Sequence, residues 1–109
     1  MTFSEYCQSF LNRPYLWGGD DPLKGFDCSG LVQEILAAYD KDPPGDQTAQ
    51  GLFNHFKPKA PIEPRPLGPG YLCFYGISHD KITHVAISVN SSQIIESGGG
   101  GSKTLTLQD

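Results

Sequence analysis

Apolar side chains recur at helical spacing in the first half of the chain and in an alternating pattern in the second half. The first helical stretch covers residues 2–12, and its opening residues have the spacing of a capping box. Arg13 ends it, because a residue that precedes proline is pushed out of the α region. Residues 14–19 are then expected to be extended, and residues 20–25 to form a loop.

Two further helices are predicted before the chain turns irregular. The second begins at Asp27 or Cys28, carries an apolar stripe of helical period and is closed by the Pro-Pro-Gly segment at 43–45. A third, less strongly patterned helix covers residues 48–56. Residues 57–70 hold five of the nine prolines, which predicts an extended, irregular connector.

Short β-type runs bounded by turn residues make up the rest of the chain. They cover residues 71–75, 84–90 and 93–97, and a hairpin turn at 90–92 joins the last two. The glycine run at 98–101 is interpreted as a flexible linker, or as a loop whose backbone passes close to another group. Helices followed by an antiparallel meander predict an α+β fold, with the N-terminal helices packed on a small sheet.

The length and charge of the chain restrict its class. Its 109 residues fit one domain, and the end of the chain soon after Leu107 leaves open whether a closing edge strand is missing. Twelve acidic against eight basic residues give a net charge of −4. This balance argues against a nucleic-acid partner and against a polybasic membrane contact.

The N-terminus and the hydropathy pattern bear on localisation. No apolar run is long enough to cross a bilayer. The first residues lack the basic region and apolar stretch of a signal peptide. A protein acting outside its own cytoplasm would therefore need another route of delivery.

Three cysteines stand far apart, at positions 7, 28 and 73. An odd count without a Cys-x-x-Cys pair argues against both a disulfide framework and a zinc cluster, so neither a metal nor a cofactor is predicted. Cys7 lies on the apolar side of the first helix and Cys73 in the middle of an apolar strand. Both are interpreted as packing residues.

Cys28 is in a different setting, in the first turn of a predicted helix. Unpaired backbone N–H groups and the positive end of the helix dipole stabilise a thiolate there, and the thiolate is the reactive form. The Cys28 N–H can also donate to an oxyanion formed when the sulfur attacks a carbonyl. Local features alone leave open whether Cys28 is reactive or a small core residue.

A histidine and a glutamate on neighbouring strands add to this picture. His84 lies at a strand start, on the face opposite Val85 and Ile87. If the turn falls at 90–92, antiparallel pairing brings Glu96 near His84, where a carboxylate would fix the tautomer and favour the imidazolium. Taken singly, each also fits a partly exposed strand residue.

Several short motifs of this sequence occur in the order that is typical of one protein family. The chain resembles an NlpC/P60 domain, the papain-like fold used by many cell-wall peptidases. The resemblance covers most of the chain from Pro14 to Glu96. Its motifs are Pro14-Tyr15-Leu16-Trp17-Gly18-Gly19, Phe26-Asp27-Cys28-Ser29-Gly30-Leu31-Val32, Pro69-Gly70 before a strand, and His84-Val85-Ala86-Ile87.

The resemblance implies catalytic roles by position. Cys28 matches the nucleophile and His84 the general base, and Glu96 falls where the family places its third, imidazole-orienting residue, often another histidine. The family usually has Gly-Asp-Leu where this chain has Gly70-Tyr71-Leu72. These two departures leave the nucleophile and base intact but bear on the pH optimum and subsite contacts.

It also implies residues that contact the substrate. Tyr15 matches a tyrosine that lines the site, and Asp27 and Ser29 match residues that flank the nucleophile and contact the amino-terminal side of the peptide. Trp17 is interpreted as core packing.

The activity implied is cysteine endopeptidase cleavage of a peptidoglycan stem peptide, most often between γ-D-glutamate and a diamino acid. Delivery to the cell wall by a phage tail, a secretion system or lysis would fit. Two alternatives stay open, namely an amidase or acyltransferase that uses the same Cys–His pair, and a non-catalytic wall-binding or structural module.

Overall fold

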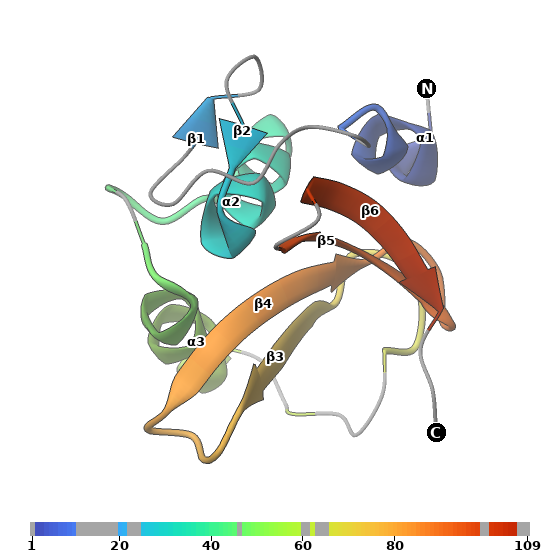
Figure 1. Cartoon of the computed structure of the whole chain (residues 1–109). Coiled ribbons are helices and arrows are strands. Elements are labelled where there is room, and N and C mark those ends of the chain that lie inside the picture. The colour runs from blue at the N-terminus through green and yellow to red at the C-terminus, as the bar shows by residue number, and fades with distance from the viewer. Residues whose placement is uncertain are drawn as a thin grey trace.

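The structure is a computed structural model, whose described residues form three α-helices and a curved antiparallel sheet (Figure 1). It describes residues 2–10, 20–21, 25–45, 47–59, 62, 66–98 and 101–106. The predicted extended segment at 14–19, with Tyr15 and Trp17, lies outside the described residues, as does the predicted end of the first helix at Arg13.

Four strands form the main sheet, and each pairs antiparallel with the next along the chain. They are β3 (Leu72–Gly76), β4 (Ile82–Ser88), β5 (Gln93–Gly98) and β6 (Gly101–Thr106). Helices α2 (Cys28–Ala38) and α3 (Ala49–Phe56) pack against β4, and α2 also contacts β5. The core between helices and sheet includes Leu31, Val32, Ile35, Leu52, Val85, Ile87 and Ile95. The predicted α+β class is confirmed.

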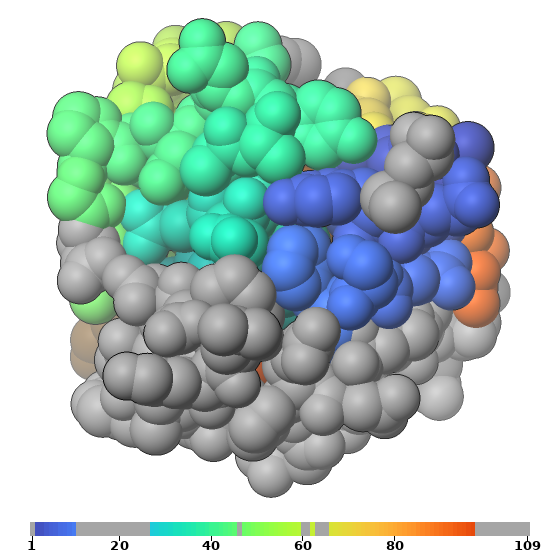
Figure 2. Space-filling view, turned by 90° about the horizontal axis from the view of Figure 1, so that it is seen from above, coloured from blue at the N-terminus to red at the C-terminus, as the bar shows by residue number. Residues whose placement is uncertain are grey.

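Helix α1 (Phe3–Gln8) begins with the predicted capping box between Thr2 and Glu5. It is shorter than the predicted 2–12 stretch. Its Phe3 ring lies 5.2 Å from the ring of Tyr39, just beyond the end of α2. In Figure 2 the surface of α1 meets the surface of the C-terminal part of α2 and the turn after it. Aromatic contacts therefore attach α1 to α2.

Helix α2 starts where the sequence predicts but ends well before the Pro-Pro-Gly segment. Asp27 is its N-cap, and Oδ1 of Asp27 accepts from the Gly30 N–H at 2.6 Å. After Ala38 the chain enters a left-handed conformation at Asp40, with φ 59°. The Asp40 and Lys41 N–H groups donate back into the last turn of the helix, a Schellman arrangement. This local closure, rather than the prolines, ends the helix.

Gln33 of α2 is a buried polar side chain that holds the loop after the helix. Its amide donates to Oδ1 of Asp42 and to the Gly45 carbonyl, both at 3.0 Å, and accepts from the Gln47 N–H at 2.9 Å. All three bonds end on residues 42–47, so one side chain anchors the connection between α2 and α3.

Replacing Gln33 with leucine should lower the free energy of unfolding by about 2 kcal/mol, because it leaves buried donors and acceptors unpaired. Urea denaturation would measure the change. The control is Gln8→Leu, which removes an exposed contact with Ser4 and should change stability by less than about 0.5 kcal/mol. Equal losses in both variants would contradict the anchoring role.

Helix α3 matches the predicted 48–56 stretch, with Thr48 as its N-cap. Leu52 and Phe53 are buried, as the apolar pattern indicates. The connector prediction is wrong for its first residues, since Lys57–Lys59 forms a 3-10 turn that continues α3.

Two pairings depart from the sequence prediction. Part of the predicted 20–25 loop is paired, because β1 (Asp20–Asp21) lies antiparallel to β2 (Gly25–Phe26). The interpretation of 98–101 as a linker is wrong, because Gly98 pairs with Gly101 and the chain returns along β5 as β6. The predicted hairpin turn at 90–92 is confirmed, with Oδ1 of Asn90 accepting from the N–H groups of Ser92 and Gln93.

Candidate active site

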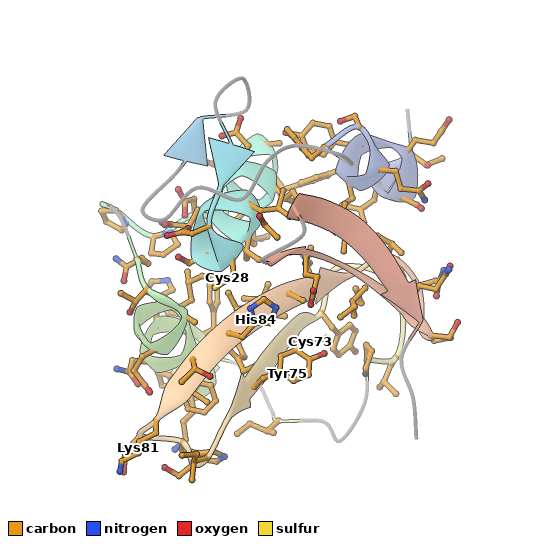
Figure 3. The ribbon with its side chains drawn as sticks, in the orientation of Figure 1. Cys28, Cys73, Tyr75, Lys81 and His84 are labelled. Carbon is orange, nitrogen blue, oxygen red and sulfur yellow. The ribbon has the colours of Figure 1, made fainter. Side chains whose placement is uncertain are left out.

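A helix and a hairpin that lie far apart in the sequence bring Cys28, His84 and Glu96 together. Cys28 is the first residue of α2, His84 lies in β4 and Glu96 in β5. Helix α2 packs on both strands, so its N-terminal turn lies beside the histidine (Figure 3). The contact between His84 and Glu96 that the hairpin predicts is confirmed.

The His84 and Glu96 side chains form a partly enclosed pair. Nε2 of His84 lies 3.0 Å from Oε1 of Glu96. The two side chains are 27% and 14% exposed, so water screens the interaction less than it would on an open surface. With Nε2 facing the carboxylate, Nδ1 is the ring nitrogen left for the thiol.

The Cys28 thiol is the only one of the three cysteines whose pKa is lowered. Burial raises the pKa of Cys28, but hydrogen bonds from the His84 side chain and the Val85 backbone, with the charge on His84, outweigh it and bring the pKa below the ordinary 9.0. The imidazolium and a backbone N–H of β4 therefore stabilise the thiolate together.

The hydrogen bond and charge that link Cys28 and His84 lower the pKa of the thiol but raise the pKa of the imidazole. The hydrogen bond with Cys28 is the largest cause that raises the pKa of His84 above the ordinary 6.5. Burial lowers it, and the hydrogen bond and charge of Glu96 raise it further. A thiol with a lowered pKa beside an imidazole with a raised one favours a thiolate–imidazolium pair, which is a poised nucleophile with its proton donor.

The residues that flank Cys28 are held at the start of α2. The Ser29 hydroxyl donates to Oδ1 of Asp27 at 3.3 Å, and only 5% of Ser29 is exposed. Asp27 thus caps the helix that carries Cys28, and Ser29 supports this cap. Their predicted contacts with the peptide, and that of Tyr15, stay predictions.

Two contributions to the site were not predicted from the sequence. Gln50 of α3 accepts from the Ile82 N–H at 2.7 Å and donates to the His79 carbonyl at 2.8 Å, which fixes the start of β4 two residues before His84. Tyr75 pairs with His84 across β3 and β4, and their ring centroids lie 5.7 Å apart. In the sequence, the available signal for Tyr75 was its place in the predicted strand at 71–75, whose alternation gives the face of the sheet on which each side chain lies.

Three other titratable side chains pack in the core or against aromatic rings. Cys7 is fully buried, and burial raises its pKa to about 12. The His79 ring packs on Phe53, and the His55 ring packs on Phe56. Among the residues that the structure describes, no group of three or more His, Cys, Asp or Glu side chains could hold a metal ion. Within the same ranges, no helix has the length and apolar character needed to span a bilayer.

Alkylation should therefore select Cys28. At about pH 7 iodoacetamide should modify Cys28 first and Cys7 last, since the reagent reacts with thiolates. Cys73 is the internal control, because it is also half-buried but burial raises its pKa. Peptide mapping by mass spectrometry measures the order. Equal rates at positions 28 and 73 would contradict an activated thiolate.

Comparison with known proteins identifies the family of this chain. A model of the NlpC/P60 family matches residues 12–108. The chain is 37% identical over 102 residues to a bifunctional muramidase/DL-endopeptidase, CwlT, of Bacillus subtilis, which covers 92% of this chain and 30% of that protein. It is 35% identical over 88 residues to the murein DD-endopeptidase MepH of Escherichia coli, covering 80% of this chain and 32% of that protein. The chain thus spans about a third of these relatives.

Solved structures show the same fold. The NlpC/P60 domain of the peptidoglycan hydrolase SagA superposes with a TM-score of 0.70 at 26% identity, covering 95% of this chain and 86% of that one. An NlpC/P60 family protein from Bacillus cereus gives a TM-score of 0.78 at 20% identity, over 98% of this chain and 34% of that one, which supports the fold alone. The predicted resemblance is confirmed, and this chain belongs to the NlpC/P60 family.

Proposed function

We propose that the chain is a cysteine endopeptidase that hydrolyses peptidoglycan stem peptides through Cys28. The observation that carries the proposal is the thiol at the start of α2, whose pKa is lowered by hydrogen bonds from His84 and Val85 against the opposing effect of burial. Family membership and relatives named as endopeptidases support the substrate class.

The geometry supports a two-step mechanism. The Cys28 thiolate attacks the amide carbonyl, and the Cys28 N–H, among the first four of α2, donates to the oxyanion. The C–N bond then breaks as the protonated His84 gives its proton to the leaving amine, which leaves an acyl group on sulfur. Water attacks this thioester, His84 takes its proton, and the carboxylic acid product leaves the regenerated thiolate.

Glu96 acts through His84 in this scheme. Its carboxylate faces Nε2, so it orients the ring with Nδ1 toward the sulfur and stabilises the imidazolium. Cys28 and His84 are thus proposed as catalytic residues, and Glu96 as the residue that positions the base.

The proposed scissile bond joins γ-D-glutamate to the diamino acid. A γ-D-glutamyl-L-lysine dipeptidyl-peptidase of Bacillus subtilis, 33% identical over 107 residues, supports this bond. MepH is named a DD-endopeptidase, so relatives differ in the bond they cleave. Delivery by a virion, a secretion system or lysis stays a prediction from the sequence.

The test is a synthetic stem peptide, L-Ala-γ-D-Glu-L-Lys-D-Ala, whose products are identified by mass spectrometry. Release of L-Ala-D-Glu with Lys-D-Ala supports the proposed bond. Cleavage of another bond in the peptide would support a peptidoglycan hydrolase but contradict the proposed scissile bond. Cross-linked dimers of the peptide are tested in parallel. If neither the peptide nor its dimers are cleaved, the proposed function is contradicted.

A further inference from the structure

An aromatic ring borders the histidine of the site on its exposed side. The Tyr75 ring lies 5.7 Å from the His84 ring at an interplanar angle of 41°, and Tyr75 is 40% exposed. In Figure 3, His84 lies between Cys28 and Tyr75. The ring therefore extends the surface of the site beyond His84, away from the nucleophile.

The backbone fixes this position. Tyr75 pairs directly with His84 in the antiparallel β3–β4 register, and the register shifts between Tyr75 and Gly76. At Gly76 a Cβ atom would collide with the Lys81 carbonyl, so the chain can bend there only without a side chain. The position of the half-exposed ring thus follows from the pairing of the β3–β4 hairpin.

The direction of the reaction decides which half of a substrate meets the ring. The sulfur holds the acyl half, whereas His84 must reach the leaving nitrogen to protonate it. The residue that carries this nitrogen therefore continues past the imidazole. Tyr75 is the described side chain in ring contact with His84, so it borders that residue.

The charged side chains near the Tyr75 ring favour binding of a cation beside it. Among the side chains that the structure describes at the site, a Cys28 thiolate, a His84 imidazolium and a Glu96 carboxylate together carry one net negative charge. Burial raises the pKa of Tyr75, and the negative charge of Glu96 raises it further. Lys81, the basic residue of the hairpin turn, lies at its tip, away from Tyr75 (Figure 3).

We propose that Tyr75 determines specificity on the leaving-group side of the cleft, where its ring receives the side chain of a diamino residue. The carbon chain packs on the ring, and the terminal ammonium is attracted by the ring face and the net charge of the site. This inference rests on the proposed amide hydrolysis and specifies the half of the substrate that this wall recognises.

Two substrates with the same acyl half test the proposal, L-Ala-γ-D-Glu-L-Lys amide and L-Ala-γ-D-Glu-Gly amide. In Tyr75→Ser, kcat/KM for the lysine substrate should fall about tenfold, mainly through KM, and that for the glycine substrate less than about twofold. Tyr75→Phe should retain the preference for lysine. The control is Ile77→Ser, which removes an apolar side chain that is 87% exposed in the turn between β3 and β4 and should change both values less than about twofold.

Each outcome separates the inference from the proposed function. An equal loss on both substrates, with a shifted pH dependence of Cys28 alkylation, would mean that Tyr75 acts on His84, and would overturn the inference while leaving the peptidase intact. Unchanged kinetics in Tyr75→Ser would also overturn it. If the unaltered protein cleaves neither substrate, nor any bond of the longer stem peptide, the proposed function fails and the inference fails with it.

Discussion

Replacing Cys28 with serine should lower kcat/KM on a stem peptide by roughly 10⁴-fold or more, with the fold unchanged. The hydroxyl occupies the place of the thiol, but its proton is too weakly acidic for the imidazole and the Val85 backbone to hold it as an anion. The site stabilises a thiolate specifically, because these hydrogen bonds outweigh the burial that raises the pKa of the Cys28 thiol.

The control applies the same change to another half-buried thiol. Cys73→Ser should retain most of the activity, since burial raises the pKa of Cys73 and it is not among the groups that shift the pKa of Cys28 or His84. Circular dichroism and the Tm of both variants check the fold. A Cys28→Ser protein that keeps activity within about tenfold of the original would contradict nucleophilic catalysis by this residue.

Loss of the Cys28 thiol should also change the titration of His84. The hydrogen bond with Cys28 is the largest cause that raises the pKa of His84. In Cys28→Ser the pKa of His84 should therefore fall, and an NMR titration of the imidazole resonances can follow it. This readout reports the contact itself and needs no substrate.

The second large effect is expected from Glu96→Gln. Removing the carboxylate charge should lower kcat/KM on the order of 10²-fold, because the glutamine stabilises the imidazolium less and holds the ring less firmly. The hydrogen bond and charge of Glu96 both raise the pKa of His84, so their loss lowers that pKa. The imidazolium is then lost at a lower pH, and the alkaline limb of the kcat/KM profile should move down.

The pH profile separates this role from a purely structural one. Asp80→Asn, which alters an exposed acid in the β3–β4 turn, should leave both limbs where they are. Because Cys28 and His84 titrate as a coupled pair, the two limbs belong to the pair rather than to either residue. A Glu96→Gln profile with the original alkaline limb would show that the carboxylate does not set the charge state of His84.

The features that the sequence predicts well are those fixed by local chemistry. The start of α2 follows from a capping aspartate before an apolar helical stripe, and this places Cys28 in the first turn. The His84–Glu96 contact follows from a short hairpin, because a turn at 90–92 leaves few ways to pair the flanking strands. Both depend on residues close together in the sequence.

The features that the sequence does not predict depend on contacts between distant segments or on the backbone conformation alone. The Val85 N–H that helps to hold the Cys28 thiolate becomes visible only when α2 packs on β4. The glycine run at 98–101 offers no side-chain alternation, so the passage from β5 to β6 resembles a linker in the sequence. The turn that closes α2 has Asp40 in a left-handed conformation, where glycine would be the usual signal.

The Tyr75 contact shows the same limit in the site itself. Its ring meets His84 because the two residues are paired across β3 and β4, but a register shift follows at Gly76. Strand alternation alone gives the face of each side chain and not the partner across the ladder. A one-residue slip in register would have placed a different side chain beside the imidazole.

Catalysis by Cys28 is tested most directly by a digest of purified peptidoglycan with the unaltered protein and with Cys28→Ala, analysed by mass spectrometry. New stem-peptide fragments are expected from the unaltered protein only, while the variant folds normally and releases none. Fragments released equally by both proteins, or none from either with slow alkylation of Cys28 in the unaltered protein, would contradict a peptidase that works through this thiolate.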